Sequence, residues 1–149
     1  MRLNKSKKTS TNLYCKFLGF LTKKGDKLSA RKLLDKTFFS VSKKLKMSKE
    51  KALNLLFSRL NSFVEMKKIR VRRKIVLVPF PISFKRRSYL IVKWIIDATK
   101  VEKKKSPLHK KLTKEITDVL EGSKSRSQNL RQTNFSKALA NKSNAHFRW

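Results

Sequence analysis

The side chains that could carry chemistry in this chain are mostly cations. Lys and Arg number 40 among 149 residues against 9 Asp and Glu, which gives a formal net charge of +31 at pH 7. A charge of this size opposes compaction, and a polyanionic partner relieves it because phosphate binding releases counterions. The composition therefore predicts a nucleic-acid partner. An anionic membrane surface and a merely well-solvated basic surface are the alternatives.

Patterns typical of catalysis or metal binding are missing from the sequence. There is no Gly-rich phosphate loop, and the carboxylates are scattered or, at Glu115, Asp118 and Glu121, spaced like one helix stripe that faces solvent or another protein. The two histidines, His109 and His146, lie far apart without a second ligand nearby. We therefore predict that the protein is not an enzyme and uses no cofactor or metal ion.

The cations gather in clusters. They occur in the segment 23–27, in 67–74, in 85–87 and in the lysine run 103–105. Arginine is prominent in the second and third clusters, where its planar guanidinium can hold a phosphate with two hydrogen bonds or stack on a base. Because these two clusters lie in or beside one predicted hairpin, we expect them to form one continuous binding surface.

The aromatic residues divide into two groups. Those within predicted helices, such as Phe17, Phe38 and Trp94, are interpreted as core or boundary residues. The chain end is different, because three rings lie there among basic residues: His146, Phe147 and Trp149. These rings could stack on bases or could hold the tail against the domain, and the sequence does not favour one role over the other.

Apolar periodicity predicts three helices in the first half of the chain. Residues 1–11 are expected to form a flexible basic arm before the first helix, which Gly25 ends. Asp26 and Ser48 can cap the second and third helices, whose apolar stripes face inward.

A β-hairpin is predicted over residues 64–82, because β-branched residues alternate there without a helical period. Arg72 and Arg73 occupy its expected turn, where the usual glycine is missing. Pro79 and Pro81 argue for an edge strand or an exit from the strand.

Three further helices are predicted after the hairpin. A strongly apolar one runs from Ser83 to about Lys100 and must be central to the fold. The next begins with Ser106 as N-cap and Pro107 as the first helical residue, and it ends at Gly122. Residues 123–133 are expected to be a loop, followed by a last helix that Asn134 caps and that holds Phe135, Ala138 and Leu139.

The predicted fold is mainly α: a bundle of about six helices with a β-hairpin inserted between helices 3 and 4. We expect one domain over residues 12–149, with a C-terminal tail over 140–149. The length of the chain suits a single core.

Compartment can be argued from several absences in the sequence. The single cysteine, Cys15, cannot form an internal disulfide, which favours a reducing compartment, and its apolar surroundings predict a buried side chain. No run of about 20 apolar residues predicts a membrane span, and the first residues lack an apolar signal core. If the protein works in an organelle, we therefore expect it to be synthesised inside that organelle.

The many Lys, Asn, Phe and Ile residues fit an A- and T-rich genome.

Four stretches resemble the bacterial-type small-subunit ribosomal protein S7 family, in matching order and spacing. They are Lys24–Arg31, the segment from Val78 to Trp94, Leu112–Gly122, and Ala140–Trp149, of which the last is the most specific. The resemblance implies a helical bundle with a protruding hairpin. It also implies binding to the 3′ major domain of small-subunit ribosomal RNA, nucleation of head assembly beside neighbouring head proteins, and a place near the messenger RNA and exit-site transfer RNA path.

Site residues follow from the same resemblance and from the clusters. The residues that we predict to contact ribosomal RNA are Lys23, Lys24, Lys27, Arg31, Lys67, Lys68, Arg70, Arg72, Arg73, Lys74, Lys85, Arg86, Arg87, Lys93, Lys142, Arg148 and Trp149.

The chain departs from the family where Arg72 and Arg73 replace the usual glycine pair, and in its shorter arm and lysine-rich linker. These departures fit a divergent, mitochondrially encoded member, with a plastid or a bacterial cytoplasm as the alternative location. A sequence-tolerant nucleic-acid-binding accessory factor is the alternative function.

Overall fold

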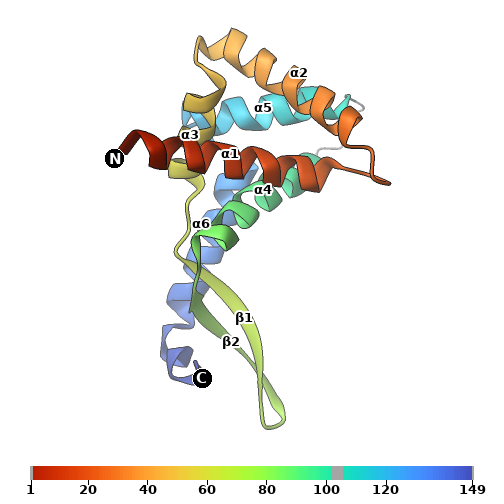
Figure 1. Ribbon diagram of the computed structural model, residues 1–149. Helices are drawn as coiled ribbons and strands as arrows, with labels where there is room; N and C mark the ends of the chain where they lie inside the picture. Colours follow the sequence, from red (N-terminus) through yellow and green to blue (C-terminus); the bar gives the residue numbers. More distant parts are fainter. Residues whose placement is uncertain (1, 102–105, 149) are drawn as a thin grey trace.

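The structure is a computed structural model that describes residues 2–101 and 106–148, with side chains from Asn12 onward (Figure 1). Six α-helices, two strands and a short 3-10 helix follow one another along the chain. They are α1 (Arg2–Leu21), α2 (Lys27–Leu45), α3 (Lys49–Leu60), β1 (Val64–Val71), β2 (Lys74–Pro81), α4 (Phe84–Val101), α5 (Leu108–Glu121), α6 (Arg126–Ala140) and η1 (Lys142–Phe147). The prediction of a mainly helical fold with a hairpin between helices 3 and 4 is confirmed.

The core lies among the first five helices. Each contributes a large side chain that is at most 2% exposed: Phe17, Phe38, Leu56, Ile95 and Ile116. These residues belong to the apolar stripes predicted from the sequence, since a helix buries the face on which its apolar residues recur. In Figure 1 these helices gather at one end of the molecule, and the hairpin extends away from them beside the end of α6.

Helix boundaries follow from local capping at several predicted positions. The Asp26 carboxylate accepts a hydrogen bond from the Ser29 backbone N–H at 3.0 Å, and Ser48 caps α3 through the Lys51 N–H at 3.4 Å. Gly122 ends α5 in the left-handed conformation, with φ of 84°. The prediction for the start of α5 is one residue too early. Pro107 has the extended ψ of 148° that an N-cap adopts, so the helix begins at Leu108.

The start of α6 differs from the prediction. The helix begins at Arg126 and absorbs most of the expected loop 123–133, so Asn134 is not its cap. Two acceptors account for the earlier start: Ser125 Oγ accepts from the Gln128 N–H, and Glu115 of α5 accepts from the Ser127 N–H at 2.9 Å and Oγ at 2.6 Å. A carboxylate at a helix N-terminus also stabilises the helix dipole. Glu115 therefore serves packing between α5 and α6 and does not belong to a free acidic stripe.

Two of the three apolar residues named for the last helix are exposed. Phe135 is 56% exposed and Leu139 is 58% exposed, and Ala138 is buried. The helix contacts α4 and the hairpin base as it leaves the bundle, and the side chains on its other face remain exposed (Figure 1).

The N-terminal backbone also differs from expectation. The flexible arm predicted over residues 1–11 is helical from Arg2, as the first half of α1. No glycine or proline interrupts this segment, and extending an existing helix costs less than nucleating one.

Candidate nucleic-acid interface

The hairpin is a regular antiparallel pair closed by two arginines. Val71 pairs with Lys74, so Arg72 and Arg73 form a two-residue turn. Arg72 has a φ of 54°, which side chains with a Cβ adopt at some cost, and the Arg70 Nε donates to the Arg72 carbonyl at 3.3 Å. The turn therefore carries backbone strain at Arg72, because two arginines occupy it instead of glycine.

The hairpin cations are exposed to solvent. Six predicted site residues share this exposure: Lys67, Lys68, Arg70, Arg72, Arg73 and Lys74. Because side chains alternate along a strand, Lys67 lies on one face of the ribbon, whereas Lys68 and Arg70 lie on the other. Lys67 packs its ammonium over the Phe80 ring at 4.9 Å. Because cations lie on both faces of the ribbon and at its tip, phosphates can be contacted from either face and from the tip.

The C-terminal tail covers the outer edge of β2. The Asn144 side-chain amide donates to the Leu77 carbonyl at 3.1 Å, and the Arg148 Nε donates to the Pro79 carbonyl at 2.6 Å. These bonds satisfy backbone acceptors of an edge strand that would otherwise be open. The sequence left open whether the tail stacks on bases or is held against the domain. The structure shows that Asn144 and Arg148 hold the tail against the domain. Trp149 lies outside the described residues, and Lys142 is exposed at the start of η1.

The hairpin base is joined to α4 by an ion pair. Glu65 of β1 accepts two hydrogen bonds from Arg86, at 2.9 Å from Nε and 2.6 Å from the terminal nitrogen. These bonds hold the pKa of the Glu65 carboxyl below its usual range, with Lys67 and Lys93 contributing further, and they raise the pKa of Arg86. The guanidinium fork of Arg86, a predicted phosphate contact, is therefore already occupied by a carboxylate.

Other predicted residues lie around this base. Arg87 donates to the Ile82 carbonyl at 3.2 Å and covers the Phe63 ring at 4.5 Å, whereas Lys85 and Lys93 are exposed. From the other side, α6 contacts the base through Asn134, whose amide donates to the Val64 carbonyl at 2.9 Å. The orientation of the hairpin is thus determined by polar contacts from two helices.

We expect Glu65→Gln to lower the free energy of unfolding by about 1 kcal/mol at pH 7, because a half-exposed charge-assisted pair is worth about that much. The folded pKa of Glu65 is depressed, so its contribution is complete above the unfolded pKa of about 4.3 and is lost as the pH falls through the folded value. Urea denaturation of wild type and variant should therefore converge in acid. Glu121→Gln, an exposed control on α5, should leave stability unchanged at both pH values.

A second basic region lies at the far end of the bundle. The Asp26 N–H donates to the Lys23 carbonyl at 3.0 Å, which closes a tight turn whose central residues, Lys24 and Gly25, have φ of 50° and 82°. Lys23 and Lys24 are exposed on this turn, as are Lys27 and Arg31 at the start of α2. In Figure 1 this turn projects at the right-hand side of the helical bundle and the hairpin tip lies at the bottom, so the predicted site residues form two separate regions.

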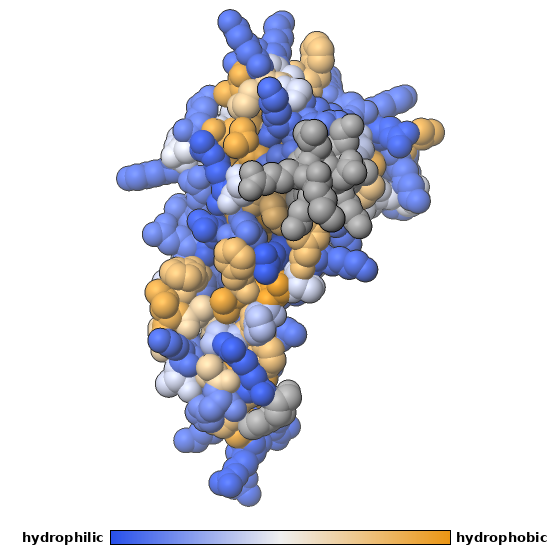
Figure 2. All heavy atoms as spheres, turned by 60° about the vertical axis from the view of Figure 1, so that its left-hand side comes forward, coloured by the Kyte–Doolittle hydropathy of each residue, from blue (hydrophilic) through white to orange (hydrophobic). Residues whose placement is uncertain are grey.

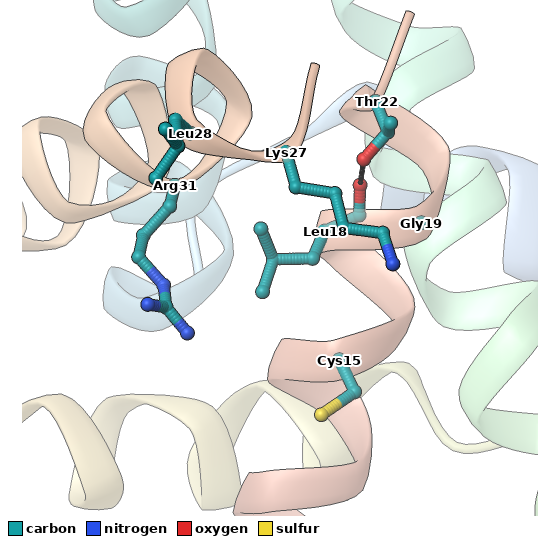
Figure 3. A pocket seen from close by; sticks show the side chains of 7 residues that line it. All are labelled: Cys15, Leu18, Gly19, Thr22, Lys27, Leu28 and Arg31. Carbon is teal, nitrogen blue, oxygen red and sulfur yellow. Dashed lines mark hydrogen bonds between the residues drawn. The ribbon is translucent and has the colours of Figure 1, made fainter. Parts of the chain in front are cut away.

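Lys27 and Arg31 also line a pocket between α1 and α2. The pocket has a volume of about 480 Å³, and Cys15, Leu18, Gly19, Thr22 and Leu28 complete its lining (Figure 3). The Cys15 side chain is exposed here, so the prediction that it is buried is wrong. The first-helix stripe turns Leu13 and Phe17 into the core instead and leaves Cys15 on the opposite face.

Some of the cations form ion pairs with carboxylates of the chain. Among the described side chains these pairs include Lys49–Asp35, Arg86–Glu65 and Lys100–Asp97, at 2.7, 2.6 and 3.7 Å. Hydrophilic side chains project around the bundle and at the narrow lower end of the molecule, with apolar patches between them (Figure 2). Within the described side chains, no three His, Cys, Asp or Glu residues could share a metal ion. No helix in residues 2–101 and 106–148 is long and apolar enough to cross a membrane.

Sequence reasoning missed residues that act through distant partners. Glu65, Asn134 and Asn144 orient the hairpin and its tail, and each bonds a group between 21 and 70 residues away. Only the position of Glu65 inside the predicted basic hairpin distinguished it from other carboxylates.

Comparison with known proteins agrees with this architecture. The model of the family "Ribosomal protein S7p/S5e" matches residues 2–142. The small ribosomal subunit protein uS7 of Wigglesworthia glossinidia brevipalpis is 32% identical over 142 residues, covering 95% of this chain and 90% of the relative. The uS7 protein of Buchnera aphidicola subsp. Cinara cedri is also 32% identical, over 145 residues, with the same coverage, and that of Anaeromyxobacter sp. Fw109-5 is 29% identical. The chain therefore belongs to the ribosomal protein S7p/S5e family, whose members are structural ribosomal proteins and not enzymes.

Proposed function

We propose that this protein is a structural constituent of the small ribosomal subunit that binds the 3′ major domain of its ribosomal RNA. The observation that carries the proposal is the protruding hairpin, whose six exposed cations extend away from the helical bundle. A two-stranded basic ribbon can follow a phosphate backbone or enter a widened RNA groove. Family membership supports a ribosomal RNA as the partner.

The second basic region supports a contact that spans more than one RNA segment. The turn at Lys23–Lys27 lies far from the hairpin tip, so one short duplex would not reach both (Figure 1). A folded RNA domain presents phosphates at several separated places, which suits both regions at once. In this arrangement the protein nucleates assembly of the subunit head, beside neighbouring head proteins and near the messenger RNA and exit-site transfer RNA path.

The compartment is part of the proposal. The relatives described above are bacterial, which suits a ribosome in a bacterial cytoplasm. The A- and T-biased composition and the extra charge at the hairpin turn favour a mitochondrial ribosome, with a plastid as a further alternative.

The test is binding to the isolated 3′ major domain and to a 5′ fragment of equal length, across a series of salt concentrations. We expect a preference for the 3′ fragment that persists near physiological salt. Affinity should also fall by orders of magnitude between low and physiological salt if about 6–10 phosphates are contacted. Equal binding of both fragments that disappears with salt would instead indicate a sequence-tolerant accessory factor.

A further inference from the structure

The pocket between α1 and α2 combines apolar walls with two cations at its rim. Leu18 and Leu28 form much of the wall, and Leu28 is 72% exposed, so its apolar surface is open at the pocket. Lys27 and Arg31 extend from the start of α2 over the same space (Figure 3). Its volume of about 480 Å³ lies within the range of small-ligand pockets, about 300–1,000 Å³.

Gly19 is the second feature of the pocket. Glycine is among the least favourable residues inside a helix, and Gly19 lies in the last turns of α1, where the chain is helical on both sides. A Cβ placed on Gly19 would meet no atom within 4 Å, so packing within the described structure does not require a glycine. The missing side chain leaves the helix backbone at Gly19 open to a group that approaches it closely.

The two cations at the rim indicate the charge of that group. Neither Lys27 nor Arg31 forms an ion pair among the described residues, and the neighbouring turn adds Lys23 and Lys24. An anion that also carries a flat apolar part would satisfy the cations and cover Leu18 and Leu28 together. A nucleotide has both parts, whereas an acidic peptide segment places its carboxylates on flexible chains and offers no flat face of comparable area.

We propose that this pocket binds one unstacked nucleotide of RNA, with the base against Leu18, Gly19 and Leu28 and a phosphate held by Lys27 and Arg31. The inference rests on the proposed function, because it specifies how the second basic region engages its RNA. It extends that function by adding an apolar base site to a region otherwise defined by charge. The base gains burial without hydrogen-bond readout, so the site tolerates different bases.

The sole cysteine provides a direct probe of occupancy. Cys15 is exposed at the pocket, so a bound base should shield its thiol from alkylation. The full-length protein is treated with iodoacetamide alone, with a short single-stranded RNA, and with an abasic oligomer of the same length and phosphate number. We expect the base-bearing RNA to slow alkylation several-fold and the abasic oligomer to leave the rate nearly unchanged.

Variants of Gly19 separate binding from folding. Gly19→Leu should fill the pocket, abolish the protection and weaken RNA binding about tenfold, while the helix becomes more stable because glycine is removed. Gly19→Ala should stabilise the helix in the same way with a smaller loss of binding. Asn129→Leu, which adds a leucine at an exposed position of α6, serves as the matched control and should retain both affinity and protection.

Several results would overturn the pocket assignment. Equal protection by the abasic oligomer would mean that phosphate attraction alone covers Cys15, and unchanged binding by Gly19→Leu would mean that the pocket stays empty. Protection by an acidic peptide and not by RNA would reassign the site to a protein partner. If preference for the 3′ domain persists without Cys15 protection, only the pocket assignment fails. If protection occurs without any such preference, the proposed function fails and the pocket remains.

Discussion

Reversing the charge of the three hairpin arginines, with Arg70→Glu, Arg72→Glu and Arg73→Glu combined, is expected to weaken binding to the 3′ major domain by about a hundredfold or more. Each lost phosphate contact removes counterion release, so the slope of log affinity against log salt should fall by about 2 to 3. The three residues lie at the tip of the ribbon, away from the helical core. The helical CD signal should therefore stay at its wild-type level, and filter binding together with CD measures both effects.

A matched triple variant controls for total charge. Lys36→Glu, Lys43→Glu and Lys44→Glu change the net charge equally but lie on exposed positions of α2, outside both basic regions. We expect this variant to lose much less affinity than the arginine variant. Equal losses would show that binding depends on overall charge, and a collapse of the CD signal in the arginine variant would show that the hairpin is part of the folding unit.

Phe38→Ala is expected to lower the free energy of unfolding by about 3–5 kcal/mol, the usual cost of removing a large aromatic side chain from a core. Phe38 is 2% exposed and packs edge-on against Phe17, with ring centroids 6.2 Å apart. A typical domain has only about 5–15 kcal/mol of stability, and the net charge of +31 reduces it further at low salt. Urea denaturation followed by CD measures the change.

The neighbouring residue provides the control. Phe39 is 71% exposed on the outer face of α2, so Phe39→Ala should change stability by no more than about 0.5 kcal/mol. Adding salt should stabilise both variants by screening the self-repulsion, while the difference between them persists because it arises from packing. Similar costs at the two positions would mean that α2 packs with a different face toward the core.

Local features of the sequence account for much of the fold. The stripes of α1 to α5 were predicted because a helix repeats every 3.6 residues and buries one face, and Phe38 is an example. Asp26 and Gly122 mark helix ends because each acts on backbone groups within a few residues. The hairpin was predicted from alternation, and its two-residue turn follows from the pairing of Val71 with Lys74.

Contacts between segments that are distant along the chain could not be predicted from the sequence. The start of α6 depends on Glu115, twelve residues before its partner Ser127, and without that acceptor the polar run after Gly122 resembles a loop. Residues 2–11 were expected to be flexible because their composition is basic, yet the helix that follows continues through them. Phe135 and Leu139 are exposed although Ala138 of the same helix is buried, and the sequence of the helix did not indicate this difference.

The candidate site shows the same division. Composition and clustering alone predicted an anionic partner and placed the arginines in the hairpin, because charge is a property of residue types and needs no fold. Tertiary structure alone decided that Arg86 is paired with Glu65, that Arg148 holds the tail on β2, and that Gly19 and Arg31 line one pocket. Each of these depends on atoms brought within a few ångströms from separate elements, and only the packing of those elements determines such distances.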